Sequence, residues 1–235
     1  MSSSSQCLMS TEASAEGVLY EHAASVRRLL LMMRSSLLLT GGLGTRLNGY
    51  EKALLPLKDG TFIENTLQIL DSVSDEVIVS FRDEEQFRFF EEYVRGREIV
   101  IDKLRNAGPL AGMLEGFKKA SGAYVFVVAC DMPYLNREVV ELLFDISDGH
   151  DAVIPVNPSG QKEPLHAVYR KRAMFDAIEF SLSKGIRSVM SPVSGLDDVL
   201  FLGSEEISKI DKGLMTFTNI NTPHDLDMLE TDRSG

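Results

Sequence analysis

Short apolar runs alternate with amphipathic segments from Ser35 onwards, and this alternation constrains the fold more strongly than any other feature. Each run is long enough for one strand, and in the segments between the runs apolar residues recur at the spacing of a helix. The run Tyr124–Ala129 (YVFVVA) is apolar on both faces, as a strand in the middle of a parallel sheet has to be. We therefore expect an α/β fold with a mostly parallel sheet covered on both faces by helices.

The same pattern assigns individual elements. Strands are predicted at Ser35–Thr40, Glu76–Ser80, Glu98–Ile101, Tyr124–Ala129, Ala152–Pro155, Ala167–Tyr169, Val199–Leu202 and Thr216–Ile220. Helices are predicted at Phe62–Asp71, Glu84–Val94, Ala111–Ala120, Asn136–Ile146, Arg172–Ser183 and Thr222–Glu230, with Asn136 as an N-cap. The alternation breaks down between residues 157 and 220, which predicts a small antiparallel addition to the sheet.

The first 34 residues do not follow this pattern. Ser2–Ser5 is a low-complexity stretch of the kind that stays disordered, whereas Glu12–Met33 carries a rough helical stripe of apolar residues. We interpret residues 1–34 as an N-terminal extension that is disordered or helical, and residues 35–235 as one folded domain.

The net charge of -11 argues against a general nucleic-acid binder, because nucleic-acid phosphates require a basic face. The two cysteines, Cys7 and Cys130, lie far apart and suggest neither a disulfide framework nor a zinc site. The longest apolar runs are much shorter than a membrane span, and the N-terminus lacks the basic start and apolar stretch of a signal peptide. We expect a cytoplasmic protein that binds neither nucleic acid nor membrane.

A glycine-rich stretch follows the first predicted strand and reads LLLTGGLGTRLNGYEKALLPL. Gly41 and Gly42 would let backbone N–H groups approach an anion closely, and Arg46 and Lys52 add positive charge. The stretch lacks the Walker pattern, and it lacks the last glycine of a dinucleotide-binding fingerprint. A turn with two solvated cations is the alternative, but the arginine and the lysine favour phosphate binding.

Two carboxylates follow strands of the predicted parallel sheet. Asp131 comes after the central strand in VVACDMPYL, at the edge where ligands bind, and is a candidate ligand for Mg²⁺ on a triphosphate. A turn or capping aspartate explains that stretch equally well. Asp102 ends another strand and precedes the turn Gly108-Pro109, after which a helix begins with small residues that leave room for close packing. Taken alone, that second stretch is best explained as a plain loop.

Four further polar residues have weaker signals. Asn219 and Asn221 flank the end of the last predicted strand, where they would contact a ligand or cap the helix that starts at Thr222. His166 lies between apolar residues, so a structural role is favoured over contact with substrate, and Glu163 is an alternative acidic group.

Taken in order, these stretches resemble the molybdenum cofactor guanylyltransferases, within the wider group of nucleotidyltransferases. The first motif of that family is matched by Leu39-Thr40-Gly41-Gly42, Arg46-Leu47, Gly49 and Glu51-Lys52, with leucine for the family methionine and glutamate for the family aspartate. The later motifs are matched at Gly108–Met113 (GPLAGM), Cys130–Tyr134 (CDMPY) and Asn219–Leu226 (NINTPHDL). The resemblance extends from about Ser35 to Leu229.

The resemblance implies a Rossmann-like three-layer sandwich that forms a nucleotidyltransferase domain over residues 35–235. It implies nucleotide contacts by Leu39, Thr40, Gly41, Gly42, Lys52, Ser80, Asp102 and Asp131, with Mg²⁺ on Asp131, and substrate contacts by Gly108, Pro109, Asn219 and Asn221. Arg46, Lys52 and Asp131 would be the catalytic residues. Ser80 stands where a relative has a nucleotide-contacting asparagine, so Asp102 is the better candidate for the base or the ribose.

The implied reaction is transfer of GMP from GTP to the terminal phosphate of molybdopterin, with release of pyrophosphate. GTP and molybdopterin would be the partners, and other cofactor-assembly proteins are possible partners too. Three alternatives stay open: a nucleotidyltransferase for CTP or another acceptor phosphate, a non-catalytic nucleotide-binding assembly protein, and a dinucleotide-binding oxidoreductase. The combination of Arg46, Lys52 and Asp131 argues against the second, and the missing glycine argues against the third.

Overall fold

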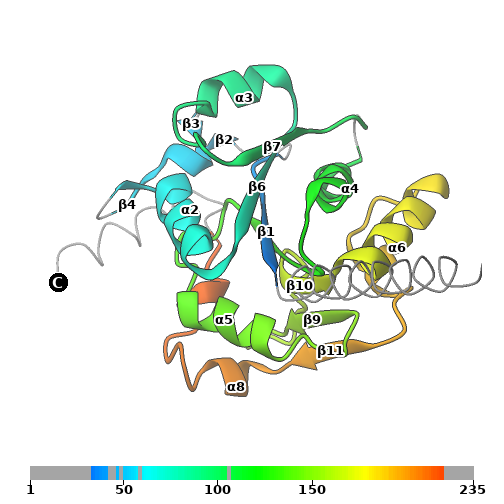
Figure 1. The fold of residues 1–235 in the computed structure, drawn as a ribbon. Helices are drawn as coiled ribbons and strands as arrows, with labels where there is room; N and C mark the ends of the chain where they lie inside the picture. The colour runs from blue at the N-terminus through cyan, green and yellow to red at the C-terminus, as the bar shows by residue number, and fades with distance from the viewer. Residues whose placement is uncertain (1–32, 42–45, 48–49, 58–59, 105–106, 220–235) are drawn as a thin grey trace, which may run out of the picture.

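The computed structural model describes residues 33–41, 46–47, 50–57, 60–104 and 107–219 (Figure 1). The predicted helix Thr222–Glu230 lies outside these residues, as does the segment Glu12–Met33 except for its last residue.

A seven-stranded sheet forms the centre of the molecule, with strand order β11-β9-β10-β8-β1-β6-β7. Its strands are β1 (Arg34–Leu39), β6 (Glu76–Phe81), β7 (Glu98–Ile101), β8 (Tyr124–Ala129), β9 (Ala152–Pro155), β10 (His166–Arg170) and β11 (Val199–Leu202). All neighbouring strands are parallel except at β10, which runs antiparallel to both β8 and β9. The mostly parallel sheet and its antiparallel addition are thus confirmed.

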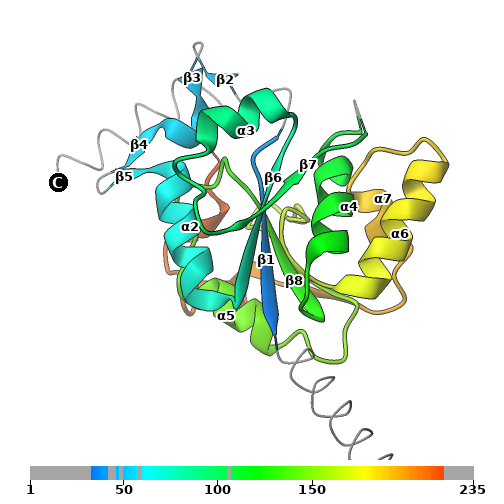
Figure 2. The ribbon, with the colours of Figure 1, turned by 45° about the horizontal axis from the view of Figure 1, so that its top comes forward.

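Helices cover both faces of this sheet, which makes three layers (Figure 2). The helices are α2 (Phe62–Val73), α3 (Glu84–Phe90), α4 (Pro109–Lys119), α5 (Arg137–Asp145), α6 (Lys171–Ser183), α7 (Met190–Val193) and α8 (Ser204–Ile207), with 3₁₀ turns η1 (Lys52–Leu54) and η2 (Met215–Phe217). Helices α2 and α5 pack on one face, whereas α4 and α6 pack on the other. Two short antiparallel pairs, β2 (Arg46–Leu47) with β3 (Tyr50–Glu51) and β4 (Pro56–Leu57) with β5 (Gly60–Thr61), complete the described elements.

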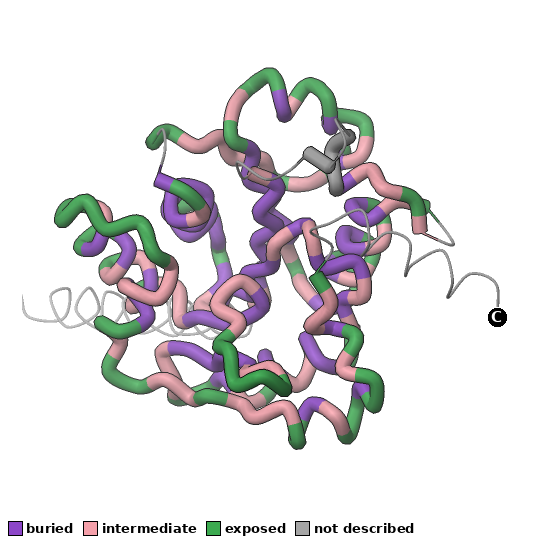
Figure 3. The backbone as a smooth tube through the Cα atoms, turned by 180° about the vertical axis from the view of Figure 1, so that it is seen from behind, coloured by how far each residue is buried: buried purple, intermediate pink, exposed green. Residues whose placement is uncertain are grey.

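The central strands are buried along most of their length because their alternate side chains enter two different cores (Figure 3). Leu38 of β1 packs with α2 and α5, while its neighbours Leu37 and Leu39 pack with α4 and α6. Phe126 and Val127 divide in the same way on β8. Burying one such side chain contributes roughly 1.5–3 kcal/mol, so the apolar runs fix which strands stand in the middle.

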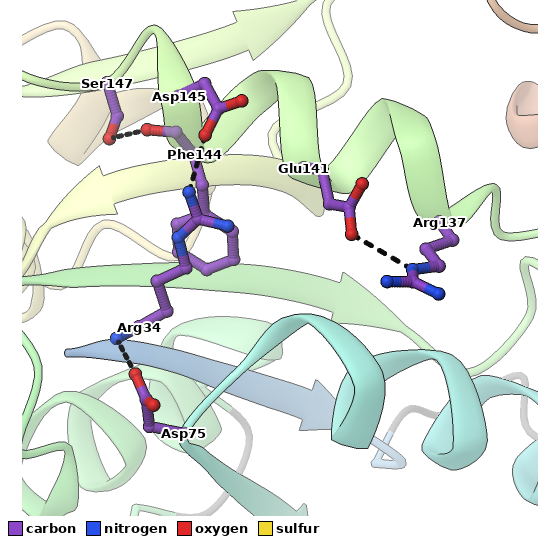
Figure 4. Close-up of polar contacts among 7 residues, drawn as sticks. All are labelled: Arg34, Asp75, Arg137, Glu141, Phe144, Asp145 and Ser147. Atoms are coloured by element: carbon purple, nitrogen blue, oxygen red, sulfur yellow. Dashed lines mark hydrogen bonds and ion pairs between the residues drawn. The ribbon is translucent and has the colours of Figure 1, made fainter. Parts of the chain in front are cut away.

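Arg34 fastens the amino end of β1 (Figure 4). Its backbone N–H donates to Asp75 Oδ2 at 2.8 Å, and its Nη2 donates to Asp145 Oδ1 at 2.6 Å. The guanidinium carbon lies 5.0 Å from the centre of the Phe144 ring, within range of a cation–π contact. The first strand is therefore tied both to the turn before β6 and to the end of α5. Just beyond that helix, the Ser147 hydroxyl donates to the Phe144 carbonyl at 2.7 Å.

Most predicted elements are confirmed with shifts of one or two residues at their ends, and two predictions need larger corrections. The predicted helix Glu84–Val94 ends at Phe90, after which the chain continues in turns. The predicted strand Thr216–Ile220 is wrong over its described part, because residues 215–217 form a 3₁₀ turn. In the part of the chain that the structure describes, no helix combines the length and apolar character needed to cross a bilayer.

Candidate functional site

Three of the polar residues predicted from the sequence, Ser80, Asp102 and Asp131, lie at the carboxyl edge of the parallel strands. Leu39, the last residue of β1, pairs with Ser80 of β6 on one side and with Ala129 of β8 on the other. Asp102 directly follows β7, and Asp131 lies two residues beyond the end of β8. The chain leaves β1 for β6 on one side while β8 flanks β1 on the other, and ligands of open α/β sheets bind at such a switch point.

Thr40 is held by the neighbouring strand. Its backbone N–H and its hydroxyl both donate to the Ser80 carbonyl, at 3.1 and 2.6 Å, and it is 1% exposed. Its own carbonyl accepts from Gln86 Nε2 at 3.0 Å, and Gln86 Oε1 accepts from the Arg82 N–H at 2.9 Å. These bonds fix the backbone from which the chain enters Gly41, which packs against the Arg82 backbone.

Ser80 and Asp102 meet at the ends of two adjacent strands. The Ser80 hydroxyl donates to Asp102 Oδ1 at 2.9 Å. Burial raises the pKa of the Asp102 carboxyl to about 6, and the hydrogen bond from Ser80 opposes that rise. A half-buried carboxylate of this kind retains a strong capacity to accept hydrogen bonds from a nucleoside.

Asp131 lies partly exposed in the turn that follows β8, at the same edge as Ser80 and Asp102. Glu163 lies on the loop before β10. Burial raises the pKa of Glu163, and the charge of Asp131 raises it further. Asn157 Nδ2 donates to Glu163 Oε1 at 2.8 Å and holds the side chain in place.

These carboxylates fit a divalent cation that shares its coordination with a ligand. Within the described residues, no three His, Cys, Asp or Glu side chains gather closely enough to hold a metal ion by themselves. Mg²⁺ often takes one or two carboxylates from a protein and completes its octahedron with waters and substrate phosphates. Asp131, with Glu163 nearby, supplies the local negative charge that such an ion requires.

Gly108 and Pro109 form the start of α4. Gly108 has φ 62° and ψ −151°, a backbone conformation that side chains rarely adopt, and Pro109 takes the first helical position, where its missing N–H is not needed. The close packing predicted after Pro109 occurs at Gly112, whose backbone faces Ser80, Leu39 and Asp102. The sequence motif thus reflects contact between α4 and the strand ends.

Other predicted site residues are only partly placed. Arg46 pairs through its backbone with Glu51 between β2 and β3, and Lys52 begins η1. Asn219 is exposed two residues after η2, while Gly42 and Asn221 lie outside the described residues. His166 is fully buried, so the structural role favoured by the sequence is confirmed for its ring.

Two residues that shape this edge were not assigned a role from the sequence. Gln86 bridges Thr40 and Arg82, but a polar residue in the first turn of a helix gives no signal of that role. Gly112 lies inside the GPLAGM motif and four residues before Gly116, and this spacing puts both glycines on one helical face. That spacing was a usable signal that α4 lies unusually close to the sheet.

Comparisons with known proteins place the chain in a family. The MobA-like NTP transferase domain family matches residues 36–199. A protein of Methanosarcina mazei named "Probable molybdenum cofactor guanylyltransferase" is 43% identical over 200 residues, which cover 83% of this chain and 88% of the relative. A relative of the same name from Natronomonas pharaonis is 32% identical over 197 residues, covering 83% of this chain and 95% of the relative.

Solved structures give the same picture. The crystal structure named molybdopterin-guanine dinucleotide biosynthesis protein A from Archaeoglobus fulgidus has a TM-score of 0.72 and 31% identity, covering 85% of this chain and 98% of that one. A 4-diphosphocytidyl-2C-methyl-D-erythritol synthase from Anaerococcus prevotii has a TM-score of 0.63 at 13% identity, covering 86% and 99%, and it shares the fold alone. The match over residues 36–199 and the relatives above 30% identity show that this chain belongs to the MobA-like NTP transferase family and is a nucleotidyltransferase.

Proposed function

We propose that this enzyme transfers GMP from GTP to the terminal phosphate of molybdopterin, forming molybdopterin guanine dinucleotide and pyrophosphate. The names of the relatives at 43% and 32% identity support this reaction. The arrangement of the carboxyl edge supports it as well. The strongest support is that Asp102 follows β7 and Asp131 follows β8, two strands that lie on opposite sides of β1. One nucleotide lying across the end of β1 would meet both.

The residues divide into a nucleotide side and an acceptor side. Leu39, Thr40, Gly41 and Gly42 would supply the backbone on which the phosphates lie, with Arg46 and Lys52 as the cations. Asp102, supported by Ser80, would accept hydrogen bonds from the nucleoside.

Asp131 would hold Mg²⁺, which when bound neutralises phosphate charge. Gly108, Pro109, Asn219 and Asn221 are assigned to the substrate.

The reaction depends on positioning of the two substrates and does not require a covalent intermediate with the protein. An oxygen of the molybdopterin phosphate forms a bond to the α-phosphorus of GTP, and the bond from that phosphorus to the bridging oxygen of the β-phosphate breaks. Pyrophosphate leaves with the bonding electron pair. Because the acceptor is already an anion near neutral pH, no general base is needed, and catalysis rests on orientation and charge stabilisation.

A second candidate is a nucleotidyltransferase that uses CTP or another acceptor phosphate. Ser80 favours it, because the resemblance described above implies a nucleotide-contacting asparagine where this chain has a serine. A non-catalytic nucleotide-binding assembly protein would bind GTP without turning it over.

Calorimetric titration with GTP, CTP, ATP and UTP, each with and without Mg²⁺, tests the base. GTP-selective binding that Mg²⁺ strengthens is expected, and a preference for CTP would favour the second candidate. Incubation with GTP and molybdopterin, followed by mass spectrometry, then tests the transfer. Formation of molybdopterin guanine dinucleotide is expected, whereas GTP binding without product would favour either transfer to another acceptor phosphate or the non-catalytic assembly protein.

A further inference from the structure

Gly112 lies where a helix meets a polar pair of the site. A Cβ atom at position 112 would come within 2.4 Å of Ser80 Oγ, 3.0 Å of Leu39 Cδ2 and 3.2 Å of Asp102 Oδ1. Real Cβ atoms essentially never approach a neighbour closer than 3.0 Å, so a side chain here would force the Ser80 hydroxyl to move.

Gly116, one turn later on α4, serves a different purpose. The three atoms nearest to a Cβ at this position all belong to the side chain of Leu37, the closest at 2.4 Å, and Leu37 is part of the apolar core. Close approach of α4 to β1 is therefore sufficient to require a glycine at position 116. It does not explain why the atoms nearest to Gly112 include the two polar side chains of Ser80 and Asp102.

The Ser80 hydroxyl is committed to Asp102. Serine has one hydroxyl proton, and here it is donated to Asp102 Oδ1 at 2.9 Å. Within the described residues, Ser80 supplies the only side-chain hydrogen bond to the Asp102 carboxylate, and a carboxylate has further lone pairs that can accept hydrogen bonds from a nucleoside. Ser80 would thus affect nucleoside binding by orienting Asp102, and not by donating a hydrogen bond to the nucleoside itself.

We propose that Ser80 and Gly112 are coupled positioning residues, in which the missing side chain at 112 makes room for the Ser80 hydroxyl that orients the Asp102 carboxylate. The inference rests on the proposed function only in taking the nucleoside as the ligand of Asp102. It assigns the second glycine of GPLAGM to nucleotide binding rather than to helix packing alone.

A double-mutant cycle on GTP affinity tests the coupling, using the wild type, Ser80→Ala, Gly112→Ala and the double variant. Each single variant is expected to weaken GTP binding about ten-fold, the worth of one hydrogen bond to a charged group. The double variant is expected to bind GTP no more than about two-fold more weakly than Ser80→Ala. The reason is that Ser80 Oγ, the atom nearest to the new Cβ, is absent from both variants. Additive losses of about a hundred-fold would overturn the proposal.

A titration without nucleotide keeps this test separate from the proposed function. The pKa of Asp102 is measured by ¹³C NMR of its carboxyl carbon, assigned with Asp102→Asn. Ser80→Ala and Gly112→Ala are both expected to raise that pKa, since each removes or displaces the hydrogen bond to the charged form. Gly116→Ala is the matched control: it is expected to lower stability in urea unfolding and to leave the Asp102 pKa unchanged.

The outcomes separate clearly. If the wild type binds no nucleotide, the proposed function fails, but the titration still decides whether Ser80 and Gly112 set the state of Asp102. If Gly112→Ala does not fold, Ser80→Ala remains a fair test because it only removes an atom. An Asp102 pKa unchanged in Ser80→Ala would overturn the inference.

Discussion

His166 Nε2 lies 3.3 Å from Thr216 Oγ1, and on the other side of the ring His166 Nδ1 lies 3.4 Å from Met132 Sδ. The ring is completely buried. The Thr216 N–H in turn donates to Asp211 Oδ2 at 2.8 Å. One buried imidazole thus joins the turn that carries Asp131 to the segment that leads to Asn219, although neither of its neighbours is a site residue itself.

Acid should destabilise the protein through this histidine. Burial lowers the pKa of His166 from 6.5 to about 4. Between these two pH values the imidazole is therefore protonated in the unfolded chain and neutral in the folded chain. The stabilising effect of a neutral His166 is fully present above pH 6.5 and is lost as the pH falls toward 4. The full difference amounts to about 3 kcal/mol, and urea unfolding across this range measures it.

Asp102 should oppose this trend within the same range. Its pKa is raised from 3.8 to about 6, so its contribution is fully present below pH 3.8 and is lost as the pH rises toward 6. In His166→Gln, the free energy of unfolding should therefore fall as the pH is raised from 4 to 6. In Asp102→Asn, it should rise over the same range more steeply than in the wild type. Identical pH profiles for the wild type and His166→Gln would contradict the buried neutral imidazole.

The sequence predicts well where burial alone decides the structure. Tyr124–Ala129 is apolar on both faces, and its bounds as a central strand match the structure. Asn136 caps α5 as expected, with Oδ1 accepting from the Val139 N–H at 3.2 Å. Such features depend on residues close in the chain or on one strand, so the pattern contains what is needed.

Secondary structure is predicted wrongly where a backbone N–H group is hydrogen-bonded by a partner outside the expected strand or helix. Thr216 resembles a strand residue, but its N–H bonds to Asp211 and its hydroxyl lies beside His166, so no neighbouring strand is required. Leu214, with φ 51°, turns the chain just before it. Likewise the Tyr93 N–H donates to the Phe90 carbonyl, a contact three residues back that ends α3 early although the apolar spacing continues.

The candidate site was predictable as a set of residues but not as a set of contacts. Asp102 and Asp131 follow strands, so their common edge could be expected from the parallel sheet. The bond between Ser80 and Asp102 depends on the pairing of β6 with β7 and on the distance of α4 from both. The spacing of residues along the chain gives neither the strand pairing nor the distance between helix and sheet.

Loss of the Arg34 side chain should destabilise the fold measurably. Arg34→Met removes the ion pair with Asp145 and the cation–π contact with Phe144, while the backbone bond to Asp75 remains (Figure 4). We expect a loss of about 1 kcal/mol in the free energy of unfolding, measured in urea.

Arg137→Met provides the matched control on α5, because Arg137 is exposed and pairs with the partly exposed Glu141 one helical turn away (Figure 4). Such pairs contribute only about 0.3–0.5 kcal/mol. Equal losses in the two variants would show that the contacts of Arg34 add nothing beyond an ordinary surface pair.

The proximity of Glu163 to Asp131 predicts a response that needs no substrate. Because the charge of Asp131 contributes to the raised pKa of Glu163, Asp131→Asn should lower that pKa, leaving the part that is due to burial. The ¹³C titration of the Glu163 carboxyl measures the shift, and Asp148→Asn, at an exposed position, is the control. A Glu163 pKa that is the same in all three proteins would mean that the two carboxylates act independently.

Asp131 is expected to matter for turnover and not for folding. Asp131→Asn keeps the shape of the side chain but removes the charge that would hold a divalent cation beside the phosphates. Turnover should fall roughly 100-fold or more, the scale seen when charge stabilisation is removed from a transition state. Initial rates of product formation with saturating GTP and molybdopterin, over a range of Mg²⁺ concentrations, give the measurement.

Circular dichroism and urea unfolding should be nearly unchanged in Asp131→Asn, because the residue is partly exposed and lies outside both apolar cores. Asp148→Asn, an exposed aspartate not among the site residues, should keep normal turnover. A rate for Asp131→Asn close to that of Asp148→Asn at ordinary Mg²⁺ would remove Asp131 from the proposed metal site. Glu163 would then be the next carboxylate to test in the same way, because the charge of Asp131 contributes to its raised pKa.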